Sequence, residues 1–159
     1  MPAAPMLRLA RAADAPGIAA LSRDRIEHGL GWSWIAPRVL RSIGDRGSNV
    51  VVACEGDSLL GFGIMKYHDD EAHLLLLAVP VHAARRGIGS SMLQWLERSA
   101  LVAGIGQVYL EARFTNGAAR AFYAKRGYRE IQTLPKYYAG REACVRLAKD
   151  LWLASVVPS

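Results

Sequence analysis

The most informative segment of the chain is LLLAVPVHAARRGIGSSML, residues 75–93. It runs from an apolar segment through a short basic loop and a Gly-Ile-Gly turn into a helix. Glycines let a ligand approach the backbone closely, and the free N–H groups and dipole of a first helical turn favour an anion. Arg85 and Arg86 add positive charge beside that turn. The pattern predicts a cradle for a pyrophosphate group, with a strand–helix turn bearing two solvated arginines as the alternative.

Around this segment, apolar periodicity predicts a mixed α/β domain, taken as one domain over residues 1–159. The run Leu74–Leu77 is apolar on both faces, which is typical of a strand at the centre of a sheet covered by helices. The expected order is β-αα-βββ-α-β-α-ββ, with a central mixed sheet flanked by helices. Asp14 is expected to cap the first helix, which should end near Gly29. The expected strands are 7–9, 50–54, 59–67, 72–79, 107–112, 128–133 and 143–149, and helices are expected near 14–29, 39–43, 88–103 and 116–127.

Composition excludes several classes of protein. Of the 159 residues, 52% are hydrophobic and 21% charged, which is typical of a globular chain rather than a disordered one. Cys54 and Cys144 are too few for a disulfide-rich secreted scaffold and are expected to be buried thiols in a reducing compartment. No metal-ligand spacing is present. No apolar run approaches the roughly 18 residues that span a bilayer, and residues 1–9 lack a secretory signal. The sequence therefore predicts a soluble, cytoplasmic protein.

The charge balance is strongly basic. There are 20 Lys+Arg against 14 Asp+Glu, a net charge of +6, and only four of the cations are lysines. Arginine forks suit phosphate groups. Nucleic acid, a ribosomal surface and a small polyanionic cofactor all remain open on composition alone. Because the aromatic segments of RNA-recognition motifs are absent from the sequence, nucleic acid is not the expected partner.

Residues 85–89 resemble the acetyl-CoA pyrophosphate loop of the GNAT superfamily of N-acetyltransferases, whose pattern is Gln/Arg-x-x-Gly-x-Gly/Ala. One departure is Ala84, which occupies the first position and removes a side-chain contact while leaving the backbone cradle. A second block of the family, Asn-x-x-Ala-x-x-Phe/Leu-Tyr-x-x-x-Gly-Phe/Tyr, is also present. It falls on Asn116, Ala119, Phe122, Tyr123, Gly127 and Tyr128. The resemblance implies a GNAT-like fold over nearly the whole chain.

Within that superfamily, residues 72–147 look like the bacterial ribosomal-protein alanine N-acetyltransferases, whereas residues 10–50 show no confident match. The resemblance rests on Tyr109–Arg113, Asn116, Tyr123, Tyr137–Tyr138 and Glu142–Ala143. It implies acetyl-CoA as co-substrate and direct attack by a protein N-terminal α-amino group in a ternary complex. The alternatives are a small amine such as a polyamine or an antibiotic-like acceptor, and a non-catalytic module that binds CoA or RNA. Monomer and homodimer both remain open.

The reaction needs a neutral amine and a proton for the departing thiolate. The resemblance implies that Tyr123 is the general acid and that Glu111, acting through water, is the general base. His73 is the competing base, since histidine has a suitable unperturbed pKa, and both could serve in one relay. The alternatives without a catalytic role are a packed helix aromatic for Tyr123, a solvated strand residue for Glu111 and a half-buried strand histidine for His73.

The remaining site residues are also implied by the resemblance. Asn116 is expected to contact the cofactor as well as cap a helix, and Ser90 to donate to a phosphate. The expected cofactor-binding residues are Leu77, Ala78, Val79, Arg85, Arg86, Gly87, Ile88, Gly89, Ser90 and Asn116. Trp32 and Trp34 either wall a substrate groove or fill the edge of the core, and Tyr137 and Tyr138 are expected to flank the acceptor.

Overall fold

A computed structural model describes residues 5–138 and 142–156 of the chain. The chain forms two compact units. The first contains the residues up to Lys66 together with Leu74–Ser99, and the second contains Tyr67–His73 and the residues from Ala100 onward. The expectation of a single domain over residues 1–159 stays a prediction.

The elements follow the predicted order, with additions. The structure adds two short 3-10 helices and a C-terminal helix to the predicted elements. The elements in chain order are β1 (Met6–Leu9), η1 (Ala12–Asp14), α1 (Ala15–Arg25), α2 (Ala36–Gly44), β2 (Ser48–Glu55), β3 (Ser58–Tyr67), β4 (Ala72–Ala78), η2 (Val81–Ala83), α3 (Ile88–Val102), β5 (Gln107–Arg113), α4 (Gly117–Lys125), β6 (Arg129–Tyr138), β7 (Glu142–Asp150) and α5 (Leu151–Val156).

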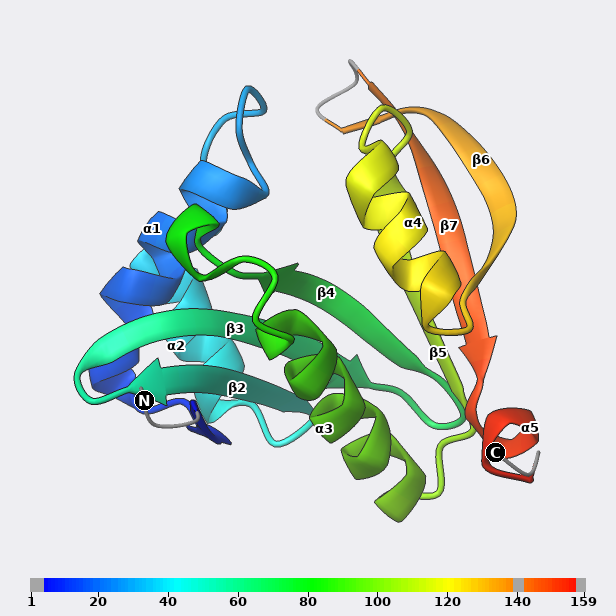
Figure 1. The fold of residues 1–159 in the computed structure, drawn as a ribbon, viewed down its shortest axis with the longest axis horizontal. Coiled ribbons are helices and arrows are strands. Elements are labelled where there is room, and N and C mark those ends of the chain that lie inside the picture. Colours follow the sequence, from blue (N-terminus) through cyan, green and yellow to red (C-terminus); the bar gives the residue numbers. More distant parts are fainter. Residues whose placement is uncertain (1–4, 139–141, 157–159) are drawn as a thin grey trace. The chain divides into compact units, whose positions relative to one another are not determined.

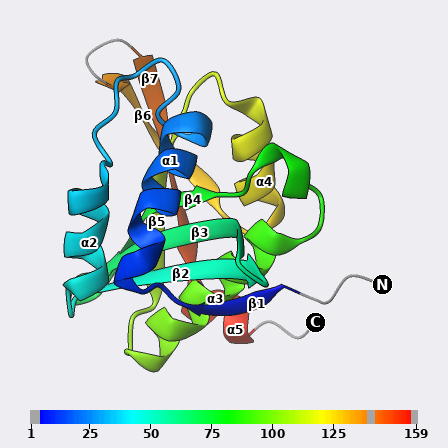
Figure 2. The ribbon, with the colours of Figure 1, turned by 90° about the vertical axis from the view of Figure 1, so that its left-hand side faces the viewer.

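In the first unit, the strands lie in the order β1-β2-β3-β4, with β1 and β3 both antiparallel to β2. Figure 2 shows β1, β2 and β3 side by side. Alternate side chains of β2 and β3 join the core formed with α1 and α2, because successive residues of a strand point to opposite faces. That core includes Ile18, Val39, Val52, Phe62 and Ile64.

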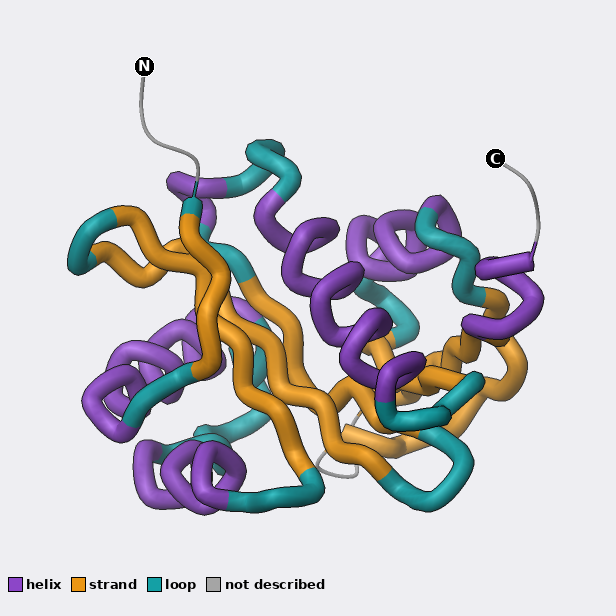
Figure 3. Tube along the Cα trace, turned by 90° about the horizontal axis from the view of Figure 1, so that it is seen from below, coloured by secondary structure: helices purple, strands orange, loops and turns teal. Residues whose placement is uncertain are grey.

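The opposite face of the same strands is covered by α3, as Figure 3 shows. Two glycines of β3 allow this close approach. A Cβ at Gly61 would lie 2.8 Å from Met92 Cε, and a Cβ at Gly63 would lie 3.0 Å from Leu96 Cδ1. At these two positions the strand has no side chain, so the large side chains of Met92 and Leu96 on α3 can approach the strand backbone closely.

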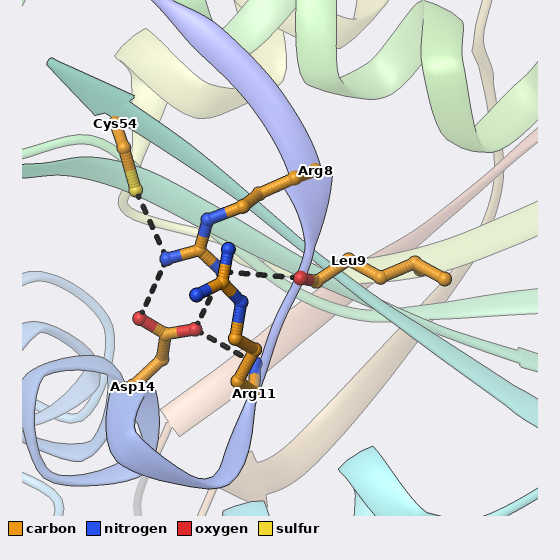
Figure 4. Close-up of polar contacts among 5 residues, drawn as sticks. All are labelled: Arg8, Leu9, Arg11, Asp14 and Cys54. Atoms are coloured by element: carbon orange, nitrogen blue, oxygen red, sulfur yellow. Dashed lines mark hydrogen bonds and ion pairs between the residues drawn. The ribbon is translucent and has the colours of Figure 1, made fainter.

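An ion pair ties β1 to the segment that precedes α1 (Figure 4). Arg8 donates to both carboxylate oxygens of Asp14, at 2.8 and 3.0 Å, and the Arg11 backbone N–H donates to the same group at 2.7 Å. The predicted N-cap position of Asp14 is confirmed. Asp14 occupies the N-cap position, but its side chain makes no capping hydrogen bond to α1 because Arg8 and Arg11 occupy it.

Two further expectations about the first unit need correction. The helix α1 ends at Arg25 and not near Gly29, since the backbone N–H groups of Ile26 and Glu27 both bond to Ser22 O and close the last turn. Cys54 is only partly buried, with Arg8 Nη2 at 3.6 Å from its sulfur, whereas Cys144 in the second unit is buried as expected.

In the second unit, β7 pairs antiparallel with β5 on one side and with β6 on the other, and α4 packs against β6 (Figure 1). The Asn116 side chain accepts from Ala119 N at 3.0 Å and caps α4 as predicted. The chain leaves α4 through Gly127, whose φ of +94° favours glycine.

The C-terminal helix α5 was not among the predicted elements. Leu151 is buried, and its backbone N–H donates to Gly106 O at 2.7 Å. The Trp152 ring lies so close to Gly106 that no side chain fits there. A six-residue helix is too short to show a clear hydrophobic period in the sequence. Contacts with the distant Gly106 hold it in place. Among the described residues, no helix is both long and apolar enough to cross a membrane.

Candidate active site

The predicted pyrophosphate loop lies in the first unit, between η2 and α3. Gly87 has a φ of +76°, and Arg85 has a φ of +65°, a value that non-glycine residues rarely adopt. Holding Arg85 there costs on the order of 1 kcal/mol, and such strain clusters at ligand-binding sites. Backbone N–H groups beside left-handed residues and in the first helical turn lack intrahelical partners and favour anions. The left-handed backbone at Arg85 and Gly87 is compatible with a bound pyrophosphate, and its binding here stays a prediction.

The two arginines of this loop differ in their surroundings. Arg86 Nη2 donates to Glu55 Oε2 at 2.8 Å, and each side chain is about one third exposed. Glu55 ends β2, so this ion pair joins the loop to the strand. Arg85 is exposed, as is Ala84, while Gly89 and Ser90 are half-buried. Part of the positive charge expected at the anion site is thus neutralised by Glu55 within this unit.

The second unit holds a cluster of charged and aromatic side chains around Glu111. This residue lies on β5 with Tyr109 on the half-buried face, while Val108, Leu110 and Ala112 are buried on the other face. The Glu111 side chain is only 6% exposed. Its Oε1 is 2.7 Å from His73 Nε2, and its Oε2 accepts from Arg146 Nε at 2.9 Å. The structure therefore brings together the two residues that the sequence offered as competing bases.

The face of the His73 imidazole ring also makes a contact. Its ring stacks on Tyr109, with centroids 4.2 Å apart and an interplanar angle of 15°. Arg146 Cζ lies 5.5 Å from the centroid of the Tyr109 ring. Arg146 sits directly opposite Glu111 in the β5–β7 register, so the pairing of these strands sets the contact. Tyr109 and Arg146 thus complete a cluster with His73 and Glu111.

Sequence reasoning did not assign a role to Arg146. A faint signal was present, since Arg146 is a charged residue between Val145 and Leu147, both of which are buried. A long cation inside an apolar strand needs a partner, but only the strand register identifies Glu111 as that partner.

The electrostatics of the cluster favour an ionised Glu111. Burial raises the pKa of this carboxyl group, but the hydrogen bond of His73 and its charge when the ring is protonated, followed by the hydrogen bond and charge of Arg146, outweigh burial and bring the pKa below the ordinary value of 4.5. Burial together with the charges of Glu71 and Glu111 raises the pKa of Tyr109. Burial and the Glu111 charge also raise the pKa of the Cys144 thiol.

Tyr123 lies on α4 and is buried. Its ring meets Phe122 at a centroid distance of 5.0 Å and Tyr128 edge-on at 5.6 Å. Burial raises the pKa of its hydroxyl above the ordinary range, so the phenol stays protonated at neutral pH. Asn116, whose Oδ1 caps α4, is exposed.

The residues predicted to contact the acceptor differ in their exposure in the structure. Trp34 is 8% exposed and belongs to the core of the first unit, which favours the packing interpretation. Trp32 is 44% exposed, and its Nε1 donates to Ala19 O at 3.2 Å. The backbone of Tyr137 and Tyr138 ends β6, and their side chains lie outside the described part of the structure.

The loop that carries both tryptophans is held by a buried carboxylate that sequence reasoning did not single out. Glu27 is 8% exposed and accepts hydrogen bonds from Ser22 Oγ at 3.2 Å, from Ser33 N at 2.7 Å and from Trp34 N at 3.2 Å. No pattern in the sequence marks this residue, because its donors come from both sides of a non-repetitive loop. Within the described ranges, no group of three or more His, Cys, Asp or Glu residues is placed to hold a metal ion.

Comparison with known proteins gives these features a context. Residues 19–128 match the acetyltransferase (GNAT) family model. An uncharacterized N-acetyltransferase from Methanocaldococcus jannaschii is 37% identical over 78 residues, which are 48% of this chain and 50% of that protein. The ribosomal protein bS18-alanine N-acetyltransferase of Escherichia coli strain K12 is 30% identical over 118 residues, 72% of this chain and 79% of that protein.

A third relative is an N-alpha-acetyltransferase from Sulfurisphaera tokodaii, 34% identical over 82 residues, 51% of this chain and 49% of that protein. The chain thus spans about half the length of the archaeal relatives and about four fifths of the bacterial one. These matches confirm the resemblance predicted from the two sequence blocks.

Solved structures share the fold. The ribosomal-protein-S18-alanine N-acetyltransferase from Escherichia coli has a TM-score of 0.79 at 24% identity, covering 92% of this chain and 94% of that one. The PaiA N-acetyltransferase from Thermoplasma acidophilum, solved in complex with coenzyme A, has a TM-score of 0.79 at 18% identity, covering 93% and 99%. The predicted α/β fold class is therefore confirmed.

Proposed function

This chain belongs to the acetyltransferase (GNAT) family, and from that premise we propose that it is an N-acetyltransferase acting on the α-amino group of a protein N-terminus. The donor is acetyl-CoA. Support for the acceptor comes from the bacterial and archaeal relatives, whose names specify a ribosomal-protein alanine and N-alpha positions. The names apply to those proteins, and for this chain the acceptor is our proposal.

The first unit supplies the binding site for the pyrophosphate of the donor in this proposal. The left-handed backbone at Arg85 and Gly87 and the open N–H groups of the first turn of α3 fit a doubly charged group. Ala84 contributes no side chain, so the site relies on backbone donors and on the loop arginines. The backbone of residues 77–79 would pair with the pantetheine arm, as the family resemblance implies.

The second unit supplies the proton transfers. The cluster of His73 and Glu111 removes a proton from the acceptor ammonium and leaves a neutral amine. The amine nitrogen attacks the thioester carbon, a C–N bond forms and the C–S bond breaks. Tyr123 donates its proton to the departing CoA sulfur, which leaves as a thiol, and the proton that the attacking nitrogen sheds as it becomes an amide restores the Tyr123 phenol through solvent. A phenol that stays protonated at neutral pH has the proton ready for this step.

The observation that carries the proposal is the hydrogen bond between His73 and Glu111 at 2.7 Å. Burying a carboxylate beside a histidine costs desolvation free energy, which a purely structural role does not require. The same pair is a common way to hold a general base in proteins. Because the chain also carries the predicted pyrophosphate loop, this pair favours an enzyme over a module that only binds CoA.

The test is release of CoA thiol from acetyl-CoA in the presence of separate acceptors, with mass spectrometry of each product. The acceptors are peptides with free α-amino groups, the same peptides with a blocked N-terminus and an internal lysine, and small polyamines and aminoglycosides. We expect acetylation of the free N-terminal peptides only. Acetylation confined to the small amines would replace the protein acceptor by the small-amine alternative. Tight acetyl-CoA binding without turnover on any acceptor would favour a binding module.

A further inference from the structure

The contacts of Glu111 indicate which of the two candidate bases, His73 or Glu111, accepts the proton. The two carboxylate oxygens of Glu111 have different partners. Oε1 bonds to His73 Nε2, and Oε2 accepts from Arg146 Nε. The side chain is 6% exposed, against 18% for His73. A carboxylate that accepts hydrogen bonds at both oxygens, one of them from a permanent cation, is a poor proton acceptor because protonation would break one of those bonds.

The same contacts identify the tautomer of His73. An ionised carboxylate has no hydrogen to donate, so the hydrogen of the His73–Glu111 bond belongs to Nε2. In a neutral imidazole the lone pair then lies on Nδ1. Stacking on Tyr109 limits rotation of the ring away from this orientation.

We propose that His73 accepts the acceptor's proton at Nδ1, and that Arg146 is the positioning residue that keeps Glu111 as its fixed, ionised partner. This inference rests on the proposed function and assigns the groups within it. Proton transfer converts the acceptor ammonium into an amine and His73 into an imidazolium, whose new positive charge faces the Glu111 carboxylate. Arg146 acts on the reaction through Glu111, whose Oε2 accepts from Arg146 Nε.

The surroundings of His73 are consistent with this assignment. On β5, the groups around the ring are Tyr109 and Glu111, and Glu71 precedes β4 and acts on Tyr109. On β7, Arg146 and Cys144 interact electrostatically with Glu111, and the neutral Gln132 of β6 lies opposite Arg146 in the register. Of these groups, Glu111 makes the direct polar contact with His73, 2.7 Å from Nε2.

The kinetic test uses an alanine-starting peptide as acceptor and four variants. We expect His73→Ala to lower kcat about 100-fold or more, with partial recovery on adding free imidazole. We expect Glu111→Gln and Arg146→Gln each to lower kcat about 10-fold, within the range seen for groups that orient an active residue. In the double variant, Arg146→Gln should add little to Glu111→Gln, because the arginine acts through the carboxylate. Additive losses would overturn the positioning role of Arg146.

Further outcomes separate the assignments. A larger loss for Glu111→Gln than for His73→Ala, without imidazole rescue, would make Glu111 the base and leave the proposed acetyl transfer intact. Arg129→Gln removes an exposed arginine of β6 and serves as the matched control for loss of one positive charge. Circular dichroism and thermal unfolding of each variant separate loss of function from loss of fold.

A readout without turnover keeps the inference testable if no acceptor is acetylated. Nitrogen-15 NMR of the imidazole distinguishes the two tautomers of His73 in the wild-type protein. We expect the hydrogen on Nε2, and a mixture of tautomers in Glu111→Gln. A hydrogen found on Nδ1 of wild-type His73 would overturn the inference whatever the activity, whereas inactivity on every acceptor with the Nε2 tautomer would count against the proposed function alone.

Discussion

Arg86 Nη2 lies 2.8 Å from Glu55 Oε2, so an arginine of the predicted pyrophosphate loop forms an ion pair with the end of the second strand. The pair is partly exposed, and its net contribution to stability is on the order of 1 kcal/mol or less. In the proposed cofactor site, a phosphate group would compete with the Glu55 carboxylate for the Arg86 guanidinium.

We expect Glu55→Gln to tighten acetyl-CoA binding about three- to tenfold at low salt, since removing one nearby negative charge frees Arg86 for the phosphates. Isothermal titration calorimetry at two salt concentrations measures the change, which should shrink as salt rises. Asp57→Asn removes the same charge from the adjoining turn and is the matched control. Equal gains from both variants would show a general charge effect and no competition for Arg86.

Tyr123→Phe removes the proposed proton donor while keeping the ring that packs against Phe122 and Tyr128. We expect kcat to fall about 100-fold, with the Kd for acetyl-CoA changed less than threefold. Stopped-flow or steady-state thiol release measures kcat, and calorimetry measures Kd. Tyr128→Phe removes a hydroxyl from the same aromatic cluster and should change kcat less than threefold. A kcat unaltered in Tyr123→Phe would assign the proton to another donor.

The lowered pKa of Glu111 links the stability of the fold to pH. A carboxyl group whose native pKa lies below its unfolded value of about 4.5 stabilises the fold above that pH, and this stabilisation is lost as pH falls through the native pKa. We expect Glu111→Gln to lower the free energy of unfolding at neutral pH and to approach the wild-type value in acid. Urea unfolding at a series of pH values measures the difference.

Other acids contribute to the same acid dependence, so a second variant is needed. The Arg120 guanidinium lowers the pKa of Glu130, which is more exposed than Glu111. Glu130→Gln should therefore show a smaller pH-dependent difference from wild type than Glu111→Gln, because solvent screens an exposed pair. A difference for Glu111→Gln that does not change between neutral and acidic pH would contradict the linkage.

Glu27 holds the loop that joins α1 to α2, and its loss should loosen that loop. We expect Glu27→Ala to destabilise the fold by about 1–3 kcal/mol, because the buried N–H of Trp34 and the partly buried N–H of Ser33 lose their acceptor. Thermal unfolding measures the loss, and Trp34 fluorescence reports exposure of the ring. Asp24→Asn, on the exposed side of α1, should leave both signals near their wild-type values. A Glu27→Ala variant as stable as wild type would mean that water satisfies the same donors.

Much of the fold follows from local patterns in the chain. The Gly-Ile-Gly turn before α3, the Asn116 cap of α4 and the alternation along β5 each depend on residues within one or two turns of each other, so backbone preference and hydrophobic period identify them. The same local character makes the loop at Arg85–Gly89 recognisable, since its chemistry belongs to the backbone. These features predicted the α/β class and the element order, except for α5 and the 3-10 helices.

The cluster around Glu111 depends on contacts between residues far apart in the chain. His73 is 38 residues and Arg146 is 35 residues from Glu111, and both contacts depend on which strands pair and in what register. A shift of one residue in β7 would turn Arg146 to the other face and leave Glu111 without it. Residue types alone therefore left His73 and Glu111 as rivals, whereas strand packing made them partners and recruited Arg146, because register is selected by burial over the whole unit and not by any local sequence signal.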